Sequence, residues 1–315
     1  MYYIGVDLGG TNIAVGIVNE KGEMLRKGSV PTNAKRPADE IIKDMGELCK
    51  KLMAEEGITA ADVEYAGIAT PGTADHDHGI VVYANNLPFV NYPLAAKLSE
   101  YSGIARVLIE NDANAAAKGE AEMGAAKGCN NSVMITLGTG VGGGIIIDKK
   151  VISGFNYAGG ELGHVVIEVD GAPCSCGRKG CWEAYSSATG LINMTKAKMQ
   201  ETKDTVMWEL APTLDDVDGK TAFDAMRKGD KAGIEVVDKY IRYLAAGLIN
   251  MINIFQPEVL VIGGGICKEG DNLLIPLRKY IDAEEYARSN EKRTEVRIAA
   301  LGNDAGIIGA AMLGF

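Results

Sequence analysis

No apolar run in this sequence approaches the ~20 residues that a membrane-spanning helix requires. A surplus of basic residues is also missing, because 32 Lys and Arg stand against 42 Asp and Glu, for a formal net charge of −10. Nucleic-acid-binding proteins usually carry basic patches. Met1 leads almost directly into an apolar segment, without the basic and cleavable apolar regions of a secretory signal. We therefore expect a cytoplasmic protein with no membrane or nucleic-acid partner.

The sequence has the composition of an ordinary globular chain, with 47% apolar and 23% charged residues among 315. This length suffices for two domains with cores of their own. The patterning predicts a three-strand meander in each half, at 2–7, 13–18 and 24–30, then at 132–137, 143–148 and 164–169. Further helices are expected at 38–56, 93–102, 183–200, 221–228, 231–254 and 271–281, with strands at 64–69, 80–83, 106–110, 258–262 and 295–300. Meanders followed by helices, repeated twice, predict an α/β fold with mixed sheets.

The two halves define the expected domains. We place a small N-terminal domain at 1–110 plus 301–315, and a large domain at 111–300 that carries the long helices. Residues 231–254 form a long, largely apolar helical pattern, which is typical of a core helix or a subunit interface rather than of a binding site.

Each half also contains a glycine turn between two apolar runs. The first turn is Asp7-Leu8-Gly9-Gly10-Thr11-Asn12, and the second is Thr136-Leu137-Gly138-Thr139-Gly140-Val141. Backbone N–H groups in such a turn can converge on an anion, and glycine lets the backbone approach it closely. A single glycine turn of this kind is usually a plain hairpin, but the duplication favours two turns that grip one triphosphate. Later glycine turns follow in both halves, at 67–72 and at Gly263-Gly264-Gly265.

Three of the six cysteines lie close together in a loop. Cys174, Cys176 and Cys181 are accompanied by His164, ten residues upstream of the first. Three thiolates and one imidazole form a recognised tetrahedral zinc set. The alternative is a disulfide, but Cys174 and Cys176 are too close to pair easily and three thiols leave one over. Four protein ligands leave no open position, so the predicted zinc is structural.

The remaining cysteines and histidines have simpler interpretations. We interpret Cys49, Cys129 and Cys267 as small buried apolar residues. His76 and His78 flank Asp77 in a polar turn between two strands, where a solvated hairpin is favoured over a metal site.

Several carboxylates and amides occupy positions suited to a polar ligand. Glu110, Asn111 and Asp112 follow an apolar strand and open an alanine-rich helix, although Asn111 or Asp112 could serve only as its cap. Glu161 lies in a glycine-rich loop, and Glu183 directly follows the cysteine loop. Together with Asn86 these groups suit sugar hydroxyls, each of which donates and accepts hydrogen bonds.

On these residues the sequence resembles the ROK family of sugar kinases, and within it most closely the bacterial glucokinases. The matching segments are DLGGTN at 7–12, ATPG at 69–72, NNLPF at 85–89, ENDANAAAKGE at 110–120, LGTGVGGG at 137–144, GGELGH at 159–164, CSCGRKGCWE at 174–183 and IGGG at 262–265. The GGELGH and CSCGRKGCWE segments are the specific ones, whereas DLGGT marks the wider actin-like ATPase superfamily. The resemblance implies an actin-like (ribonuclease H-like) α/β fold of two related domains with a cleft between them.

The resemblance also implies a role for each matched residue. Asp112 would be the base that takes the proton from the sugar hydroxyl attacking the γ-phosphate of ATP, and Asp7 would position Mg²⁺, through water. The implied sugar-binding residues are Gly72, Asn86, Asn111, Asp112, Glu161, His164 and Glu183. The implied nucleotide-binding residues are Asp7, Gly9, Gly10, Thr11, Asn12, Gly138, Thr139, Gly140, Gly263, Gly264 and Gly265. His164 would serve both the sugar and zinc.

The implied reaction is the phosphorylation of a hexose, with glucose expected and glucose 6-phosphate as product. N-acetylmannosamine, N-acetylglucosamine, fructose and allose remain alternative acceptors, and polyphosphate an alternative donor. A homodimer or homotetramer is implied. The family also contains sugar-responsive transcriptional repressors, but those carry an N-terminal helix-turn-helix, whereas here DLGGT begins at residue 7.

Overall fold

The computed structural model describes residues 1–315, and its contacts divide the chain into two compact units. Unit 1 comprises Met1–Met134, Gly144–Gly160 and Ala299–Phe315, and unit 2 comprises Ile135–Gly143 and Glu161–Ile298. The domain limits expected from the sequence, 1–110 plus 301–315 and 111–300, stay a prediction. None of the helices combines the length and the apolar character needed to cross a membrane.

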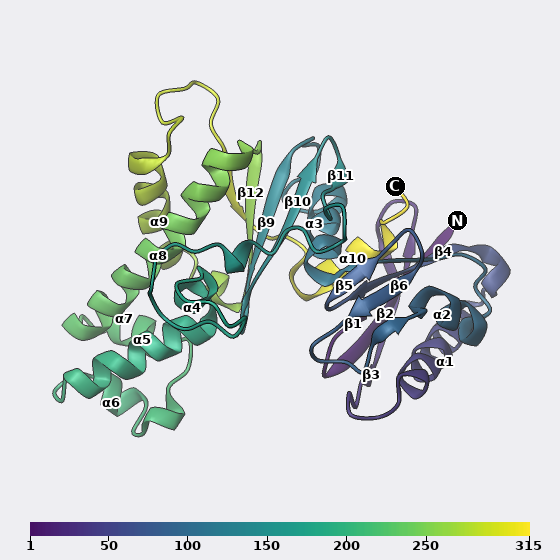
Figure 1. Ribbon diagram of the computed structural model, residues 1–315, viewed down its shortest axis with the longest axis horizontal. Coiled ribbons are helices and arrows are strands. Elements are labelled where there is room, and N and C mark those ends of the chain that lie inside the picture. Colours follow the sequence, from purple (N-terminus) through teal and green to yellow (C-terminus); the bar gives the residue numbers. More distant parts are fainter. The chain divides into compact units, whose positions relative to one another are not determined.

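Unit 1 is built on a five-stranded sheet with the order β3-β2-β1-β4-β8 (Figure 1). Strands β1 (Tyr2–Leu8), β2 (Asn12–Asn19) and β3 (Met24–Pro31) form the expected antiparallel meander. Strands β4 (Val63–Thr70) and β8 (Val107–Asn111) run parallel to β1. As a result, β1, β4 and β8 all end at one edge of the sheet, and Asp7, Thr70 and Asn111 lie there.

The alternation of side chains along β1 explains how helices cover this sheet. Ile4, Val6 and Leu8 belong to the core shared with α1 (Ala38–Glu56), and α2 (Leu94–Ser102) packs beside α1. The intervening Gly5 faces α10 (Ala305–Ala311), where an added Cβ would lie 1.9 Å from the carbonyl oxygen of Ile307. Helix α3 (Asp112–Met123) packs on α10. Glycine thus lets α10 sit directly on the strands.

Three short strands also belong to unit 1. They are β5 (Thr73–Asp75), β6 (Ile80–Tyr83) and β7 (Val90–Tyr92), paired antiparallel in sequence order. The turn between β5 and β6 carries His76, Asp77 and His78.

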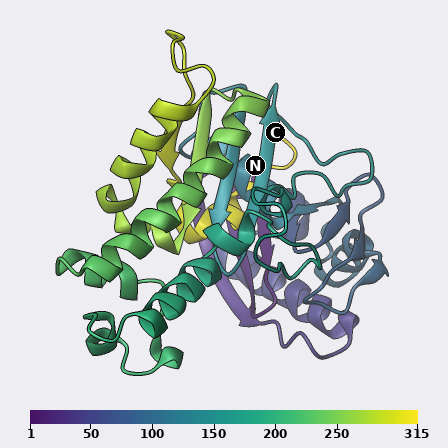
Figure 2. The same ribbon diagram turned by 60° about the vertical axis from the view of Figure 1, so that its left-hand side comes forward.

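A second five-stranded sheet has the order β11-β10-β9-β12-β13, with β9 (Ser132–Leu137), β10 (Val141–Ile147), β11 (Lys150–Val151), β12 (Val259–Gly264) and β13 (Glu295–Ile298). The helices of unit 2 are α4 (Glu183–Ser186), α5 (Ala188–Glu201), α6 (Met207–Leu210), α7 (Thr221–Arg227), α8 (Lys231–Phe255) and α9 (Asp271–Glu284). Figure 2 shows α8 among its neighbours, and it packs against α5, α7 and α9. Its apolar face is buried, which confirms a core helix.

Trp182 is the largest fully buried side chain, and it packs against α8 at Gly247. A Cβ on Gly247 would lie 1.9 Å from the indole ring, whose Nε1 donates to the carbonyl of Tyr243 at 3.1 Å. The residue before Glu183 is therefore anchored in the core of unit 2.

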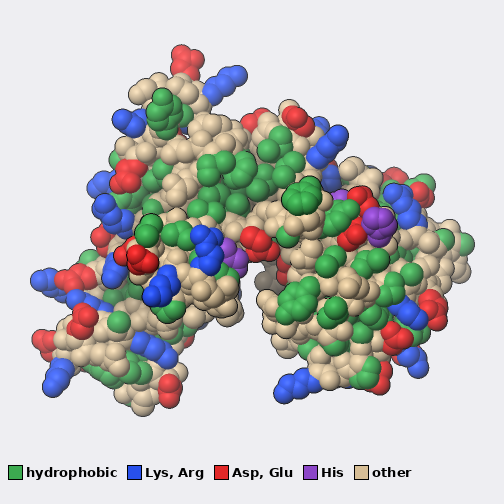
Figure 3. Space-filling model, in the orientation of Figure 1, with side chains coloured by type: hydrophobic (Ala, Val, Ile, Leu, Met, Phe, Trp, Pro, Cys, Tyr) green, Lys and Arg blue, Asp and Glu red, His purple; other side chains and the backbone are tan.

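On the surface, acidic and basic side chains are interspersed over the helices (Figure 3).

Of the three cysteines expected to be buried, only Cys49 is fully buried, whereas Cys129 and Cys267 are half-buried. Two predicted secondary-structure elements were also wrong. Residues 164–169 are not a strand, because Val166 makes only an isolated bridge to Cys181 and the third meander strand is the short β11. The apolar residues there instead pair with the cysteine loop. The helix expected at 183–200 is two helices, since Ser187 leaves helical geometry and its hydroxyl accepts from the N–H of Gly190 at 3.0 Å. Such a cap competes with continuation of the helix.

Candidate functional site

The predicted zinc ligands come together in unit 2. The ligand atoms of His164, Cys174, Cys176 and Cys181 all lie within 4.8 Å of one another. The Cys174 Sγ lies 3.6 Å from His164 Nδ1, and the Cys176 and Cys181 sulfurs are 3.7 Å apart. Tetrahedral zinc with Zn–S bonds of about 2.3 Å places its ligand atoms about 3.6 to 3.8 Å apart. The cluster therefore fits zinc, and none of its cysteines forms a disulfide.

Backbone hydrogen bonds bring the histidine segment beside the cysteine loop. The N–H of Ile167 donates to Gly180 at 2.9 Å, and the N–H of Trp182 donates to Val165 at 2.8 Å. Gly180 adopts φ +75°, and a Cβ there would lie 1.6 Å from the carbonyl oxygen of Glu168. Glycine is thus required for this close approach.

The second glycine turn lies against the cysteine loop and the start of α5. The Glu183 carboxylate accepts from the N–H of Val141 at 3.0 Å and from the Ser175 hydroxyl at 3.3 Å. A Cβ on Gly140 would lie 2.4 Å from this carboxylate. Glu183 therefore joins two segments that the sequence treated separately, the predicted phosphate turn and the metal loop.

Other residues of unit 2 also support this turn. The N–H of Ala188 donates to Gly138 and the Thr189 hydroxyl donates to the carbonyl of Thr139, both at 2.8 Å. A Cβ on Gly264 would lie 2.0 Å from the carbonyl oxygen of Leu137, so the end of β12 packs against the same turn. Sequence reasoning missed Thr189, and the helix break at Ser187 was the signal that could have found it.

The first glycine turn, in unit 1, has a different support. The N–H of Gly9 donates to Asn12 at 2.9 Å, and the buried Thr32 hydroxyl donates to the carbonyl of Gly9 at 2.6 Å. Gly10 faces Asn86, whose Cβ would lie 3.6 Å from a Cβ on this glycine. The turn thus brings together predicted nucleotide- and sugar-binding residues. Thr32 was missed because it lies in an unremarkable position just past β3.

Asp7 and Asp112 occupy the same edge of the first sheet. Burial, and to a smaller extent the negative charge of Asp112, raise the pKa of Asp7 to about 6, with Lys27 acting in the opposite direction. Two neighbouring carboxylates, of which Asp7 is half-buried, make a site that a divalent cation would neutralise. The donor set therefore fits Mg²⁺, which prefers oxygen ligands and keeps several waters.

Asn111 is both the cap of α3 and a contact of Gly72. Its side-chain oxygen accepts from the N–H groups of Ala113 and Asn114 at 2.9 and 3.2 Å, and its Nδ2 donates to the Gly72 carbonyl at 3.1 Å. Of the two residues that could cap the helix, Asn111 is the cap. Asp112 follows at the first helical position, where negative charge is favourable.

The predicted residues therefore form two sets. Unit 1 holds Asp7, Gly9, Gly10, Thr11, Asn12, Gly72, Asn86, Asn111 and Asp112. Unit 2 holds Gly138, Thr139, Gly140, Glu161, His164, Cys174, Cys176, Cys181, Glu183, Gly263, Gly264 and Gly265.

Mixed sheets flanked by helices define an α/β fold consistent with the actin-like ATPase class. Within this class, the family model "ROK family" matches residues 3–314, and the chain belongs to that family. It is 37% identical to a glucokinase of Halalkalibacterium halodurans, over 99% of this chain and 94% of that one. It is also 37% identical to a glucokinase of Thermotoga maritima, over 98% of this chain and 96% of that one.

Among solved structures, it is similar to a ROK family glucokinase from Streptomyces griseus in complex with glucose and AMPPNP. The two chains are 36% identical with a TM-score of 0.81, and the alignment covers 99% of each.

Proposed function

We propose that this protein is an ATP-dependent hexose kinase that converts glucose to glucose 6-phosphate. The observation that carries the proposal is the edge where β1 and β8 end, with Asp7, Asn111 and Asp112 beside the glycine turn and Asn86. The glucokinase relatives, and the similar structure with glucose and an ATP analogue, support glucose and ATP as substrates.

In this proposal Asp112 is the general base. Its carboxylate takes the proton from the 6-hydroxyl of the sugar while that oxygen attacks the γ-phosphorus of ATP, and ADP leaves. Asn111, fixed by α3 and by Gly72, donates and accepts hydrogen bonds with the sugar next to it. Gly72, Asn86, Glu161, His164 and Glu183 complete the proposed sugar-binding set.

The glycine turns supply the proposed phosphate contacts. Gly9 to Asn12 and Gly138 to Gly140 present backbone N–H groups, and Gly263, Gly264 and Gly265 hold the adenosine end. Phosphoryl transfer depends mainly on positioning and charge neutralisation. Mg²⁺ held through Asp7 would neutralise phosphate charge.

The zinc cluster has a structural role in this proposal. With four protein ligands it has no open position for a substrate. His164 binds zinc through Nδ1, the nitrogen near Cys174 Sγ, which leaves Nε2 for the sugar. We further propose a cytoplasmic homodimer or homotetramer.

The direct test is a coupled ADP-release assay with Mg-ATP and glucose, mannose, fructose, N-acetylglucosamine and N-acetylmannosamine. The highest kcat/KM is expected with glucose. A preference for an N-acetylated sugar or fructose would contradict the glucose assignment but keep the kinase. No ADP release with any sugar, despite sugar binding, would contradict ATP as donor and leave polyphosphate to be tried.

A further inference from the structure

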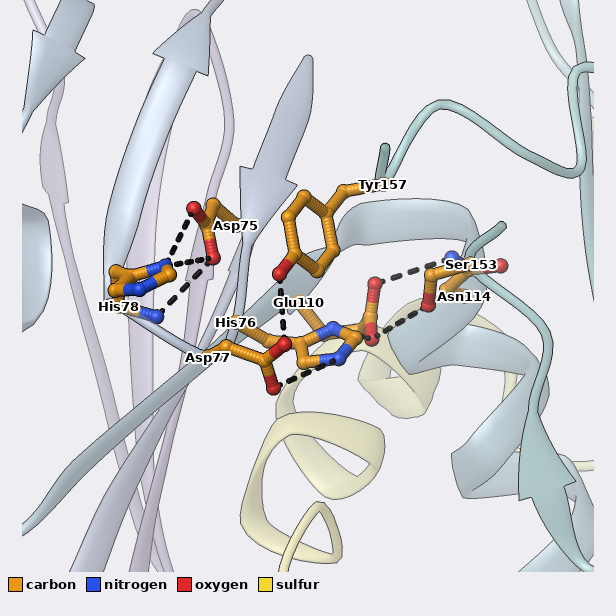
Figure 4. Close-up of polar contacts among 8 residues, drawn as sticks. All are labelled: Asp75, His76, Asp77, His78, Glu110, Asn114, Ser153 and Tyr157. Carbon is orange, nitrogen blue, oxygen red and sulfur yellow. Dashed lines mark hydrogen bonds and ion pairs between the residues drawn. The ribbon is translucent and has the colours of Figure 1, made fainter. Parts of the chain in front are cut away.

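A polar cluster lies directly before the proposed base, at the junction of β8 and α3 (Figure 4). At its centre is Glu110, only 5% exposed. One carboxylate oxygen, Oε1, accepts from the N–H of Asn111 at 2.9 Å and from Asn114 Nδ2 at 3.1 Å. The other, Oε2, accepts from the Ser153 hydroxyl at 3.2 Å and lies 3.3 Å from His76 Nδ1. We call these residues the Glu110 cluster.

The first oxygen fixes the start of α3. Because Oε1 binds the N–H of Asn111, its position determines the peptide plane that precedes Asn111 and Asp112. Asn114 is 2% exposed and its Oδ1 has no hydrogen-bond partner, so the contact with Glu110 orients its amide. A rotation of the Glu110 carboxylate would therefore disturb two contacts of the helix start at once.

His76 contacts the second carboxylate oxygen of Glu110, Oε2. From the sequence we expected a solvated hairpin at 76–78, and His78 is indeed exposed, with its Nδ1 2.9 Å from Asp75. His76 instead turns toward Glu110 (Figure 4). The structure records this contact as an ion pair of 3.3 Å between His76 Nδ1 and Glu110 Oε2, and because a carboxylate only accepts, the imidazole stabilises it when Nδ1 carries a proton.

Tyr157 holds the other side of the imidazole. The two rings meet edge to face with centroids 4.9 Å apart, and the Tyr157 hydroxyl donates to Asp77 at 2.7 Å. Tyr157 has φ +61°, an unfavourable conformation for a residue with a side chain. Backbone strain of this kind persists where surrounding contacts impose it, often at functional sites.

We propose that His76 is a positioning residue for the phosphoryl transfer. Through its ion-pair contact with Oε2 of Glu110 it fixes that carboxylate, and through Oε1 the carboxylate sets the backbone that aims Asn111 and Asp112. Tyr157 keeps the imidazole in place, so the loop at 153–160 is tied to the same point. This inference rests on the proposed role of Asp112 as the base.

Three substitutions of His76 separate its possible contributions. In His76→Asn, the side-chain nitrogen reaches about the position of Nδ1 and can still donate to Glu110. His76→Gln places its nitrogen nearer the position of Nε2, which faces Asp77. His76→Phe keeps a ring against Tyr157 but has no donor.

Steady-state kinetics with glucose and ATP should show a loss in kcat rather than in sugar KM. Misplacement of reacting groups can cost large factors in rate, and we expect kcat to fall about 10-fold in His76→Phe and His76→Gln. His76→Asn should stay within about 3-fold of the unmodified protein, and sugar KM should change by less than about 3-fold in all three. Thermal unfolding of each variant controls for general destabilisation.

Equal kcat in His76→Phe and the unmodified protein would overturn the inference, as would equal losses in the Asn and Phe variants. If His76→Phe does not fold, Ser153→Ala removes the other donor to Oε2 and should lower kcat by about 3-fold at unchanged KM; unchanged kcat there would overturn the inference. Asp112→Asn distinguishes failure of the proposed function from failure of the inference about His76. If Asp112→Asn retains turnover, the proposed base is wrong, whereas an inactive Asp112→Asn with normal His76→Phe rejects only the role of His76.

Discussion

The two glycine turns have similar sequences but different supports. The first, at Gly9, is held from the side by Thr32, whose buried hydroxyl donates to the carbonyl of Gly9 and whose N–H donates to that of Thr11. The second, at Gly138 to Val141, is held by the start of α5 and by the carboxylate of Glu183, which itself adjoins the cysteine loop. The repeated motif thus determines the backbone shape of each turn, whereas the residues that hold the turn in place differ between the two halves. In unit 2, Glu183 thereby links the second turn to the predicted zinc ligands.

The largest predicted effect follows from disrupting this link at the cysteine loop. Cys176→Ala should lose stoichiometric zinc, loosen the loop before Glu183 and lower kcat/KM for glucose by about 100-fold or more. Zinc content and ATP-analogue affinity should be measured together, because the loss should reach the second turn through Glu183. Cys129→Ala, outside the cluster, is the matched control. Full zinc content with normal activity in Cys176→Ala would contradict the structural metal.

A matched pair of threonines tests the difference between the turns. Thr32→Val and Thr189→Val each remove a hydroxyl that donates to a turn carbonyl. The Thr32 hydroxyl is buried, and a buried acceptor left without its donor costs about 1–3 kcal/mol, whereas the Thr189 contact is exposed and water can replace its hydroxyl. We therefore expect ATP KM to rise about 10-fold in Thr32→Val and about 2-fold in Thr189→Val, where the turn has other supports. Equal increases in ATP KM in the two variants would contradict the claim that the two turns differ in their support.

The smallest effect concerns pH, because only the first turn follows an acidic residue. Asp7 has a pKa near 6 in the folded state against 3.8 ordinarily, so the folded protein holds this proton more tightly. The associated stability is present below about pH 4 and is lost as pH rises toward about 6.

Asp7→Asn should therefore stabilise the metal-free protein at pH 8, by up to about 3 kcal/mol for a shift of about two pKa units. Urea unfolding at several pH values measures this, and the advantage should shrink as pH falls from about 6 to about 4. Thr136→Val, at the equivalent position of the second turn, should show no such pH dependence. An advantage of Asp7→Asn that does not vary with pH would contradict the raised pKa.

Local patterns predicted much of this molecule. The meander of unit 1, helix α1 and the long helix α8 follow from apolar periodicity that burial satisfies, and they occur where expected. The residues of the Cys/His cluster could be named because the cysteine spacing brings three thiols together without tertiary information. A cap at Asn111 or Asp112 was one alternative that the sequence left open, because short polar side chains at helix starts satisfy open N–H groups.

The remaining features depend on contacts distant in sequence. Residues 164–169 have a strand-like pattern, but their partner is the cysteine loop rather than a sheet. Thr32 and His76 gained their contacts from segments far along the chain, at Gly9 and Glu110. No local pattern signals such a partner, so His76 was interpreted as part of a solvated turn.

The measurement that tests the central claim most directly compares Asp112→Asn with the unmodified protein. Glucose binding would be followed by calorimetry, and glucose-dependent ADP formation by the coupled assay. We predict glucose affinity within about 10-fold of normal and a loss of turnover of at least about 100-fold, because the variant keeps hydrogen bonding but cannot take a proton. Near-normal ADP formation by Asp112→Asn would contradict the account.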